Sequence, residues 1–193
     1  MFPHFAGAVS SISTFPVTEE LSLRIVNHLR IALLGAWLGS AIYFSAVVAP
    51  SAFGVLRSFS LANAGEIAGS IVTRTLYVVN MSGLLMSLLL LATAFTVRKC
   101  YGRASFILHS ALLIVVTIST AIGEWVIAAR MRGLRTAMHG QIDLVPLDDP
   151  NRIAFAALHG YSVAALSIAM IAALVAVVLM ISSGEKLSDN SLE

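Results

Sequence analysis

The chain has 193 residues, of which 58% are hydrophobic and only 11% are charged. Soluble domains carry about 25% charged residues, and a compact fold of this length exposes too much surface to hide so many apolar side chains from water. The composition therefore excludes an ordinary water-soluble domain. The formal net charge of +2 provides no strong basic field for nucleic acid, and the single cysteine, Cys100, excludes an intramolecular disulfide.

Four segments are long and apolar enough to cross a bilayer, which takes roughly 20 residues of helix. They are residues 31–53, 76–97, 105–129 and 153–181. Hydrocarbon offers no partner for an unpaired backbone group, so runs of this length must be helical. The predicted fold class is all-α: a polytopic membrane protein with four transmembrane helices in an antiparallel bundle.

We expect three regions along the chain. Residues 1–30 form a polar and interfacial N-terminal segment, residues 31–181 form the four-helix transmembrane domain, and residues 182–193 form a polar C-terminal tail. Residues 61–75 have a helix-compatible composition and can extend the second span backward. Residues 130–151 contain glycines and prolines and predict the only long loop.

Four spans place both termini on one side of the membrane, here called side A, and the loops after the first and third spans on the other, side B. Lysine and arginine divide equally, six on each side, so the positive-inside rule leaves the orientation open. The short loop at residues 98–103 crowds basic residues around Cys100 on side A, which favours a cytoplasmic and reducing side A. We expect an integral protein of the cell (inner) membrane with cytoplasmic termini.

Three predicted spans each place a polar side chain at a similar depth from side B. These are Asn80 in the second span, Glu124 in the third and His159 in the fourth, with Arg152 at the rim. An ionisable residue inside a span is costly unless it is paired or hydrated, so Glu124 is a functional candidate. Together these residues predict a polar pocket for a small cation or a proton, with His159 as the titratable partner.

Helical periodicity supports an inward polar face on two of these spans. The third span aligns His109, Thr117, Thr120 and Glu124, and the second aligns Tyr77, Asn80, Gly83 and Ser87. The alternative interpretation is a packing network, because polar side chains also join transmembrane helices. In that case Glu124 pairs with an arginine at the rim, and Arg74, Arg130 and Arg152 are the candidates.

A second pair of candidate residues lies near side A. His28 precedes the first span, and His109 lies about one turn inside the third. Two imidazoles from two helices can hold a haem iron from both sides, which makes haem b the candidate cofactor. No binding motif surrounds either histidine, so ordinary interfacial histidines are the competing interpretation.

Gly35 and Gly39 form a GxxxG pair in the first span, a spacing that lets two helices approach closely. The pair is compatible with packing inside the bundle and with a homo-oligomer formed through this face. No phosphate-binding glycine loop, zinc cluster or serine–histidine–acid set is present in the sequence. No catalytic residue is identified, so the sequence gives no support for an enzyme.

Several short motifs occur in a characteristic order between Gly35 and Ala173. The first span ends in VVAPSAFGVL, with Ala49, Pro50 and Phe53, and Ala64 and Gly65 follow it. The fourth span opens with RIAFAALHGYS, which contains Arg152, Phe155, His159, Gly160 and Ser162. In this order the motifs resemble the transmembrane protein 205-like family, a domain of unknown function. The resemblance implies a four-helix membrane protein without an established reaction, and Glu124 matches no position of the family pattern.

Three hypotheses of function remain open. The first is binding or movement of a small cation or proton through the polar pocket. The second is a haem-binding or redox membrane protein. The third is a non-enzymatic assembly or interaction subunit. The lipid bilayer is the expected partner in each case, nucleic acid is not, and the small-molecule ligand is unknown.

Overall fold

The computed structural model describes residues 17–61, 63–98, 101–138 and 142–189, so Cys100 lies outside the described residues. The first span is a continuous helix of three parts: α1 (Val17–Tyr43), a π-helical segment η1 (Phe44–Val48) and α2 (Ala49–Ser58). Helix α3 (Ala64–Ala92) is the second span. It includes residues 64–75, which confirms the predicted backward extension.

Pro50 lies inside the first helix, although proline lacks an N–H and its ring clashes with the carbonyl four residues before it. The π-helical segment directly precedes it. The N–H of Ala49 bonds to the carbonyl of Phe44, five residues back, so the backbone has already left the α-helical pattern at this point. The helix can therefore continue to Ser58, beyond the predicted end of the span at residue 53.

The third span is longer than expected, so the prediction of a loop over residues 130–151 is wrong for residues 130–137, which are helical, and for Pro150 and Asn151, which begin the last helix. Helix α4 (Arg103–Ala121), the π-helical segment η3 (Ile122–Ala128) and α5 (Ala129–Ala137) follow one another without a break. The reason is that a single glycine, Gly133, costs a helix only about 1 kcal/mol, while the arginine, methionine and leucine residues around it are good helix formers.

A short 3₁₀ turn, η4 (Ile142–Leu144), leads to the last helix, α6 (Pro150–Asp189). Pro150 is the first residue of α6, where proline is well tolerated because the N–H of the first turn has no helical partner. Helices α1 and α6 run without interruption across residues 30–31 and 181–182, where we expected the transmembrane domain to begin and end.

The structure confirms an all-helical fold with four helices long and apolar enough to cross a membrane. They cover Leu21–Ser58, Ala64–Ala92, Arg103–Ala137 and Pro150–Ser183. Large apolar side chains lie exposed along the outside of all four, for example Ile42, Leu85, Ile114 and Ile171. A surface of this kind requires lipid around it, since soluble monomers rarely expose large contiguous apolar patches.

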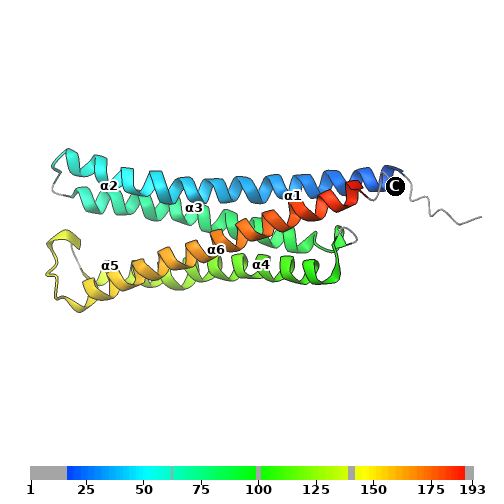
Figure 1. Cartoon of the computed structure of the whole chain (residues 1–193). Helices are drawn as coiled ribbons and strands as arrows, with labels where there is room; N and C mark the ends of the chain where they lie inside the picture. Colours follow the sequence, from blue (N-terminus) through cyan, green and yellow to red (C-terminus); the bar gives the residue numbers. More distant parts are fainter. Residues whose placement is uncertain (1–16, 62, 99–100, 139–141, 190–193) are drawn as a thin grey trace, which may run out of the picture.

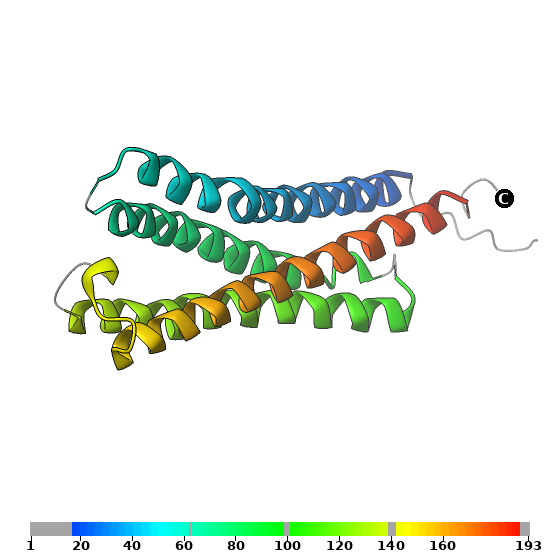
Figure 2. The same ribbon diagram turned by 60° about the vertical axis from the view of Figure 1, so that its left-hand side comes forward.

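The four spans form an elongated bundle in which consecutive spans are antiparallel (Figure 1). Helix α3 packs against α1, α2 and α4, while α6 packs against α4, α5 and α1. Figures 1 and 2 show α6 crossing the bundle diagonally, from α5 at one end to α1 at the other. Helix α1 begins and α6 ends at the same end, which is side A. The core between the helices includes Leu34, Trp37, Leu113, Ala169 and Ala173.

Candidate functional site

Glu124 lies in the π-helical segment η3 and is only 4% exposed. Its Oε1 atom accepts a hydrogen bond from Nη1 of Arg132 at 3.0 Å, which makes the contact an ion pair. The Arg132 side chain is 53% exposed, so a buried carboxylate is capped by a guanidinium that reaches it from the side-B rim. Arg132 was not among the rim arginines that the sequence suggested as partners.

Asn80 lies on the neighbouring helix, against the residue that precedes Glu124. It is buried in α3, and a Cβ atom added to Gly123 would lie 3.3 Å from its Nδ2 atom. The amide of Asn80 therefore packs against the backbone of the residue that precedes Glu124. Asn80, Gly123, Glu124 and Arg132 are called the side-B cluster below.

The other two residues expected in this pocket lie elsewhere. His159 is exposed on the outside of α6. Arg152 is half-buried, and its Nη1 donates to the carbonyl of Val145 in the loop before α6. The structure thus places Asn80 against Gly123, next to Glu124 in the chain, whereas His159 and Arg152 are not part of the side-B cluster.

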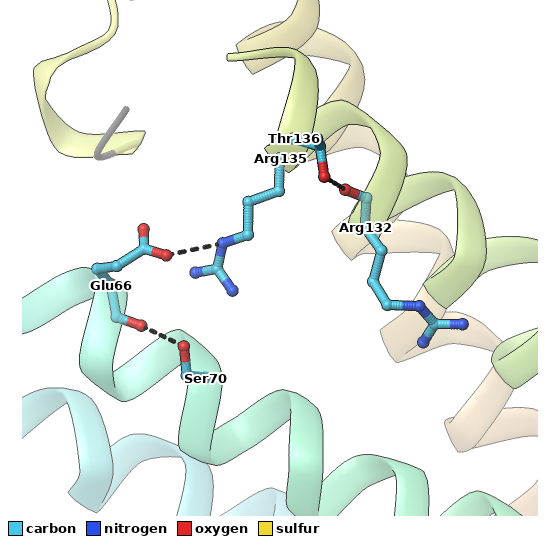
Figure 3. Close-up of polar contacts among 5 residues, drawn as sticks. All are labelled: Glu66, Ser70, Arg132, Arg135 and Thr136. Carbon is cyan, nitrogen blue, oxygen red and sulfur yellow. Dashed lines mark hydrogen bonds and ion pairs between the residues drawn. The ribbon is translucent and has the colours of Figure 1, made fainter. Parts of the chain in front are cut away.

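A second ion pair joins α3 to α5 near the side-B cluster (Figure 3). Arg135 Nε lies 3.1 Å from Glu66 Oε1, and both side chains are half-buried. The Arg135 N–H is not aimed at that oxygen, so the contact is an ion pair without a hydrogen bond. A Cβ at Gly69 would lie 3.0 Å from Arg135 Nη2, which means that the arginine lies directly over this glycine.

Polar side chains continue along the inner face of α4 toward side A. Thr120 is buried and donates to the carbonyl of Val116 at 2.8 Å. Thr117 donates to the hydroxyl oxygen of Ser87 on α3 at 2.9 Å. The predicted inward faces of the second and third spans thus meet along α3 and α4, except that Tyr77 is half exposed.

A buried arginine holds the spans together near side A. Arg30 is 3% exposed. Its Nη1 atom donates to the carbonyl of Leu90 at 2.8 Å and to the hydroxyl of Thr93, both at the end of the second span. Its Nη2 atom lies 3.2 Å from Nε2 of His109 on α4. One guanidinium thereby joins three spans.

Two more residues extend this arrangement to α6. Tyr101 stacks on His109 with ring centroids 5.4 Å apart, and its hydroxyl donates to Oδ1 of Asn27 at 3.2 Å. Asn27 Nδ2 in turn donates to the carbonyl of Met180 at 3.4 Å. Asn27, Arg30, Thr93, Tyr101 and His109 are called the side-A network below.

The hydrogen bonds fix the protonation of His109. Arginine only donates, so Nε2 of His109 must accept from Arg30, and the proton of the neutral ring is on Nδ1. In this arrangement neither nitrogen offers a lone pair to a metal. His28 is exposed and its Nδ1 lies 2.7 Å from the carbonyl oxygen of Arg24 on its own helix. Of the two proposed haem ligands, His28 is thus exposed and His109 is buried between the spans.

Asn27 and Arg30 are the residues that the sequence interpretation missed. We assigned them to an interfacial segment because they precede the apolar run. Their spacing carried a signal, since Asn27, Arg30, Leu34 and Trp37 recur at helical intervals of three and four residues and all four are buried. The polar face of the first span therefore begins one turn before its apolar run.

The described residues contain no group of three or more His, Cys, Asp or Glu side chains that could hold a metal ion. The GxxxG glycines also lack an internal role, because a Cβ at Gly35 or Gly39 would meet no atom within 4 Å. These two residues therefore do not support close helix contact inside the bundle.

The fold and its two buried polar clusters define an integral membrane protein built from four helices. The chain belongs to the family described as a domain of unknown function (DUF4149), which it matches over residues 32–140, more than half of its length. The match includes Ala49, Pro50, Phe53, Ala64 and Gly65 but ends before Arg152 and the motif that follows it. No curated protein and no solved structure matches the chain.

Proposed function

We propose that this protein binds a small cation at the Glu124 carboxylate, within the helix bundle and close to side B. One observation carries the proposal: a carboxylate that is 4% exposed has as its ion-pair partner an arginine that is itself half in solvent. Arg132 can turn toward water when another cation takes its place, whereas the buried carboxylate is costly to leave unpaired and therefore requires a positive partner. Arg132 then acts as a competitor that occupies the site until a cation displaces it.

The neighbouring groups fit this role. Asn80 places its side-chain amide against Gly123, the residue before Glu124, and carboxylate and amide oxygens are suitable ligands for a hard cation or a protonated amine. The interior toward side A is less suitable, because the buried Arg30 guanidinium repels a second positive charge. The arrangement therefore favours binding from side B over passage through the bundle.

The test is a titration of the detergent-purified protein with sodium ions and with methylammonium, followed by calorimetry. Glu124→Gln should abolish binding, and Asn80→Ala should weaken it. Arg132→Gln should strengthen binding, because it removes the positive charge that competes for the carboxylate. Glu66→Gln is the matched control, because it removes the other ion-paired carboxylate of this region and should leave binding unchanged.

Two results would count against the proposal. One is wild-type binding in Glu124→Gln; the other is no binding of either cation to the wild type or to Arg132→Gln. If the ion pair between Glu124 and Arg132 only stabilises the helix, Glu124→Gln and Arg132→Gln lose stability without any change in cation binding. Accumulation of each variant in the membrane, at the wild-type level, controls for folding.

A second candidate function is assembly with another copy of the chain through the Gly35 and Gly39 face. The observation in its favour is the open space beyond both glycines, since small residues at this spacing permit close helix approach. Gly35→Ile should abolish a crosslinked dimer without harming the fold. Gly54→Ile, also next to open space, is the control that should leave the dimer intact. Crosslinking that persists in Gly35→Ile would exclude this face.

The finer relationship to transmembrane protein 205-like proteins is likewise a proposal. It is supported by the order of motifs, of which the first two lie inside the matched region. The haem alternative has no comparable support, because Arg30 engages one nitrogen of His109 and His28 is bonded within its own helix. An absorption band that shifts when the purified protein is reduced would indicate a bound haem and would support this alternative again.

A further inference from the structure

One exposed tyrosine or tryptophan lies on each of the four spans, toward side B. The four residues are Tyr43, Tyr77, Trp125 and Tyr161, called the aromatic belt below. The remaining tyrosine and tryptophan, Tyr101 and Trp37, are buried. Tyrosine and tryptophan gather at the boundary between a membrane and water, because their rings are apolar while their O–H or N–H group is polar.

Contacts between α1 and α3 place the first two belt residues at a similar height. The indole of Trp37 donates to the carbonyl of Val79, so these two positions lie side by side in antiparallel helices. Tyr43 follows Trp37 by less than two turns, and Tyr77 precedes Val79 by less than one. Both aromatic residues therefore lie between this contact and side B, within about 10 Å of it along the bundle.

The other two belt residues lie at a comparable height. Asn80 of α3 packs against Gly123 of the third span, and Trp125 follows Gly123 toward side B. Tyr161 of α6 lines the same pocket as Arg130, which follows Trp125 by about one and a half turns. The aromatic belt thus occupies one layer of the bundle, about 10 Å thick.

Basic residues mark the opposite boundary, at side A. They are Arg24 on α1, Arg98 after α3 and Arg103 at the start of α4. On each of these three spans, about 20 residues separate the arginine from the belt residue. This corresponds to about 30 Å of helix, the thickness of a hydrocarbon core. Between the two levels, none of the described charged side chains of the four spans is exposed.

All four helices continue past the aromatic belt toward side B, by about 10 to 15 residues or about 15–20 Å. Exposed arginines occur in these extensions, namely Arg57, Arg74, Arg130 and Arg132. A charged side chain that faces hydrocarbon costs several kcal/mol, so these arginines belong outside it. The charges and the aromatic side chains therefore place the side-B boundary at the same level.

We propose that the aromatic belt is an interaction surface for the lipid headgroup region of the side-B leaflet. The rings lie against the upper acyl chains, and their O–H and N–H groups donate to ester and phosphate oxygens. The side-B extensions of the four helices then stand outside the hydrocarbon. Glu124 directly precedes Trp125, so its carboxylate lies at the membrane boundary. The proposal does not depend on cation binding by Glu124.

The test is quenching of tryptophan fluorescence in phosphatidylcholine vesicles that contain a nitroxide-labelled lipid. The nitroxide is placed either near the glycerol or in the middle of the acyl chain. Trp125 should lose more emission with the shallow label than with the deep one. Trp125→Phe, which retains only Trp37, provides the background. Ile114→Trp in the Trp125→Phe chain is the matched control, because this exposed position of α4 lies about 16 Å deeper and should show the reverse order.

Two more variants of the Trp125→Phe chain extend the test to other helices. Tyr161→Trp should respond like Trp125, with stronger quenching by the shallow label. Val55→Trp lies at an exposed position of α2 beyond the aromatic belt, so iodide on both sides of the vesicle should quench it and neither lipid label should. Stronger quenching of Trp125 or Tyr161→Trp by the deep label would overturn the proposal. So would quenching of Val55→Trp by either lipid label as strong as that of Trp125.

Discussion

Arg30 shows how one side chain can organise a membrane bundle. Its planar guanidinium has donors in a fixed fork, and these reach a carbonyl and a hydroxyl at the end of the second span and an imidazole on α4. A lysine carries the same charge as a compact ammonium and cannot reach three groups on two helices in this geometry. The arrangement therefore depends on the shape of the guanidinium as well as on its charge.

We expect Arg30→Lys to lower the free energy of unfolding by about 2 kcal/mol, from three contacts that each contribute about 0.6 kcal/mol in a membrane protein. The measurement is a detergent unfolding titration. Arg74→Lys, at an exposed position of α3, is the control and should stay within about 0.5 kcal/mol of wild type. Equal stability of Arg30→Lys and wild type would show that the network adds nothing.

Residue positions in the candidate site were partly predictable. The inward placement of Asn80 and Glu124 followed from helical periodicity, because both lie on spans with a distinct polar face. The placement of His159 did not follow, since α6 is apolar on all sides and its sequence marks no inward face. The pairing of Glu124 with Arg132 could not be predicted either. The two residues are eight positions apart, which is about 12 Å along an ideal helix, whereas side chains that pair on a helix are usually three or four positions apart.

At the scale of elements, α1 and α3 meet through a tryptophan and a glycine. Trp37 Nε1 donates to the carbonyl of Val79 at 3.0 Å, and its indole ring lies against Gly83. A Cβ at Gly83 would come within 2.6 Å of the ring atom Cε2. The glycine of α3 is therefore needed for close approach, whereas the GxxxG pair of α1 faces outward.

Gly83→Ala should destabilise the bundle by roughly 1–3 kcal/mol, because the added methyl group must displace a rigid ring that is packed on all sides. Trp37 fluorescence, recorded with Trp125→Phe to remove the other tryptophan, should shift toward the red as the ring is exposed. Gly39→Ala is the matched control, since nothing lies within 4 Å of its Cβ position. A Gly83→Ala protein with wild-type stability and emission would contradict this packing.

The existence and type of each span could be predicted, whereas their ends could not. Apolar length fixes where a helix must cross lipid, but a helix continues into the polar region as long as nothing stops it. Helix α5 is the example: its arginines interrupt the apolar run without interrupting the hydrogen-bond pattern. Helix α2 is another, because the π turn directly before Pro50 has already replaced the α-helical hydrogen bonds that a proline would disturb.

At the scale of the whole molecule, the orientation of the bundle in the membrane can be predicted and tested. We predict that side A faces the cytoplasm. Cys100 is the single cysteine and lies between α3 and α4, on side A. In a Cys100→Ser chain, Leu147→Cys places a thiol on side B, in the loop before α6, where Leu147 is 78% exposed.

A membrane-impermeant maleimide added to intact cells should label the Leu147→Cys variant and spare the wild type. After the cells are opened, Cys100 should become reactive, and labelling of denatured protein provides the reference for complete modification. Labelling of Cys100 in intact cells together with protection of Leu147→Cys would reverse the orientation. The Glu124 site would then open to the cytoplasm.

The π-helical segment η3 sets the helical phase of every residue that follows it in the third span. A π turn holds one residue more than an α turn, so every side chain after Ala128 is rotated relative to an uninterrupted α-helix. A relative that lacks one residue between Ile122 and Ala128 would turn the following arginines by about 100°. In such a chain a different side chain would face the carboxylate although no residue had been substituted. A gap of one residue in an alignment would, at this place, mean an exchange of ionic partner.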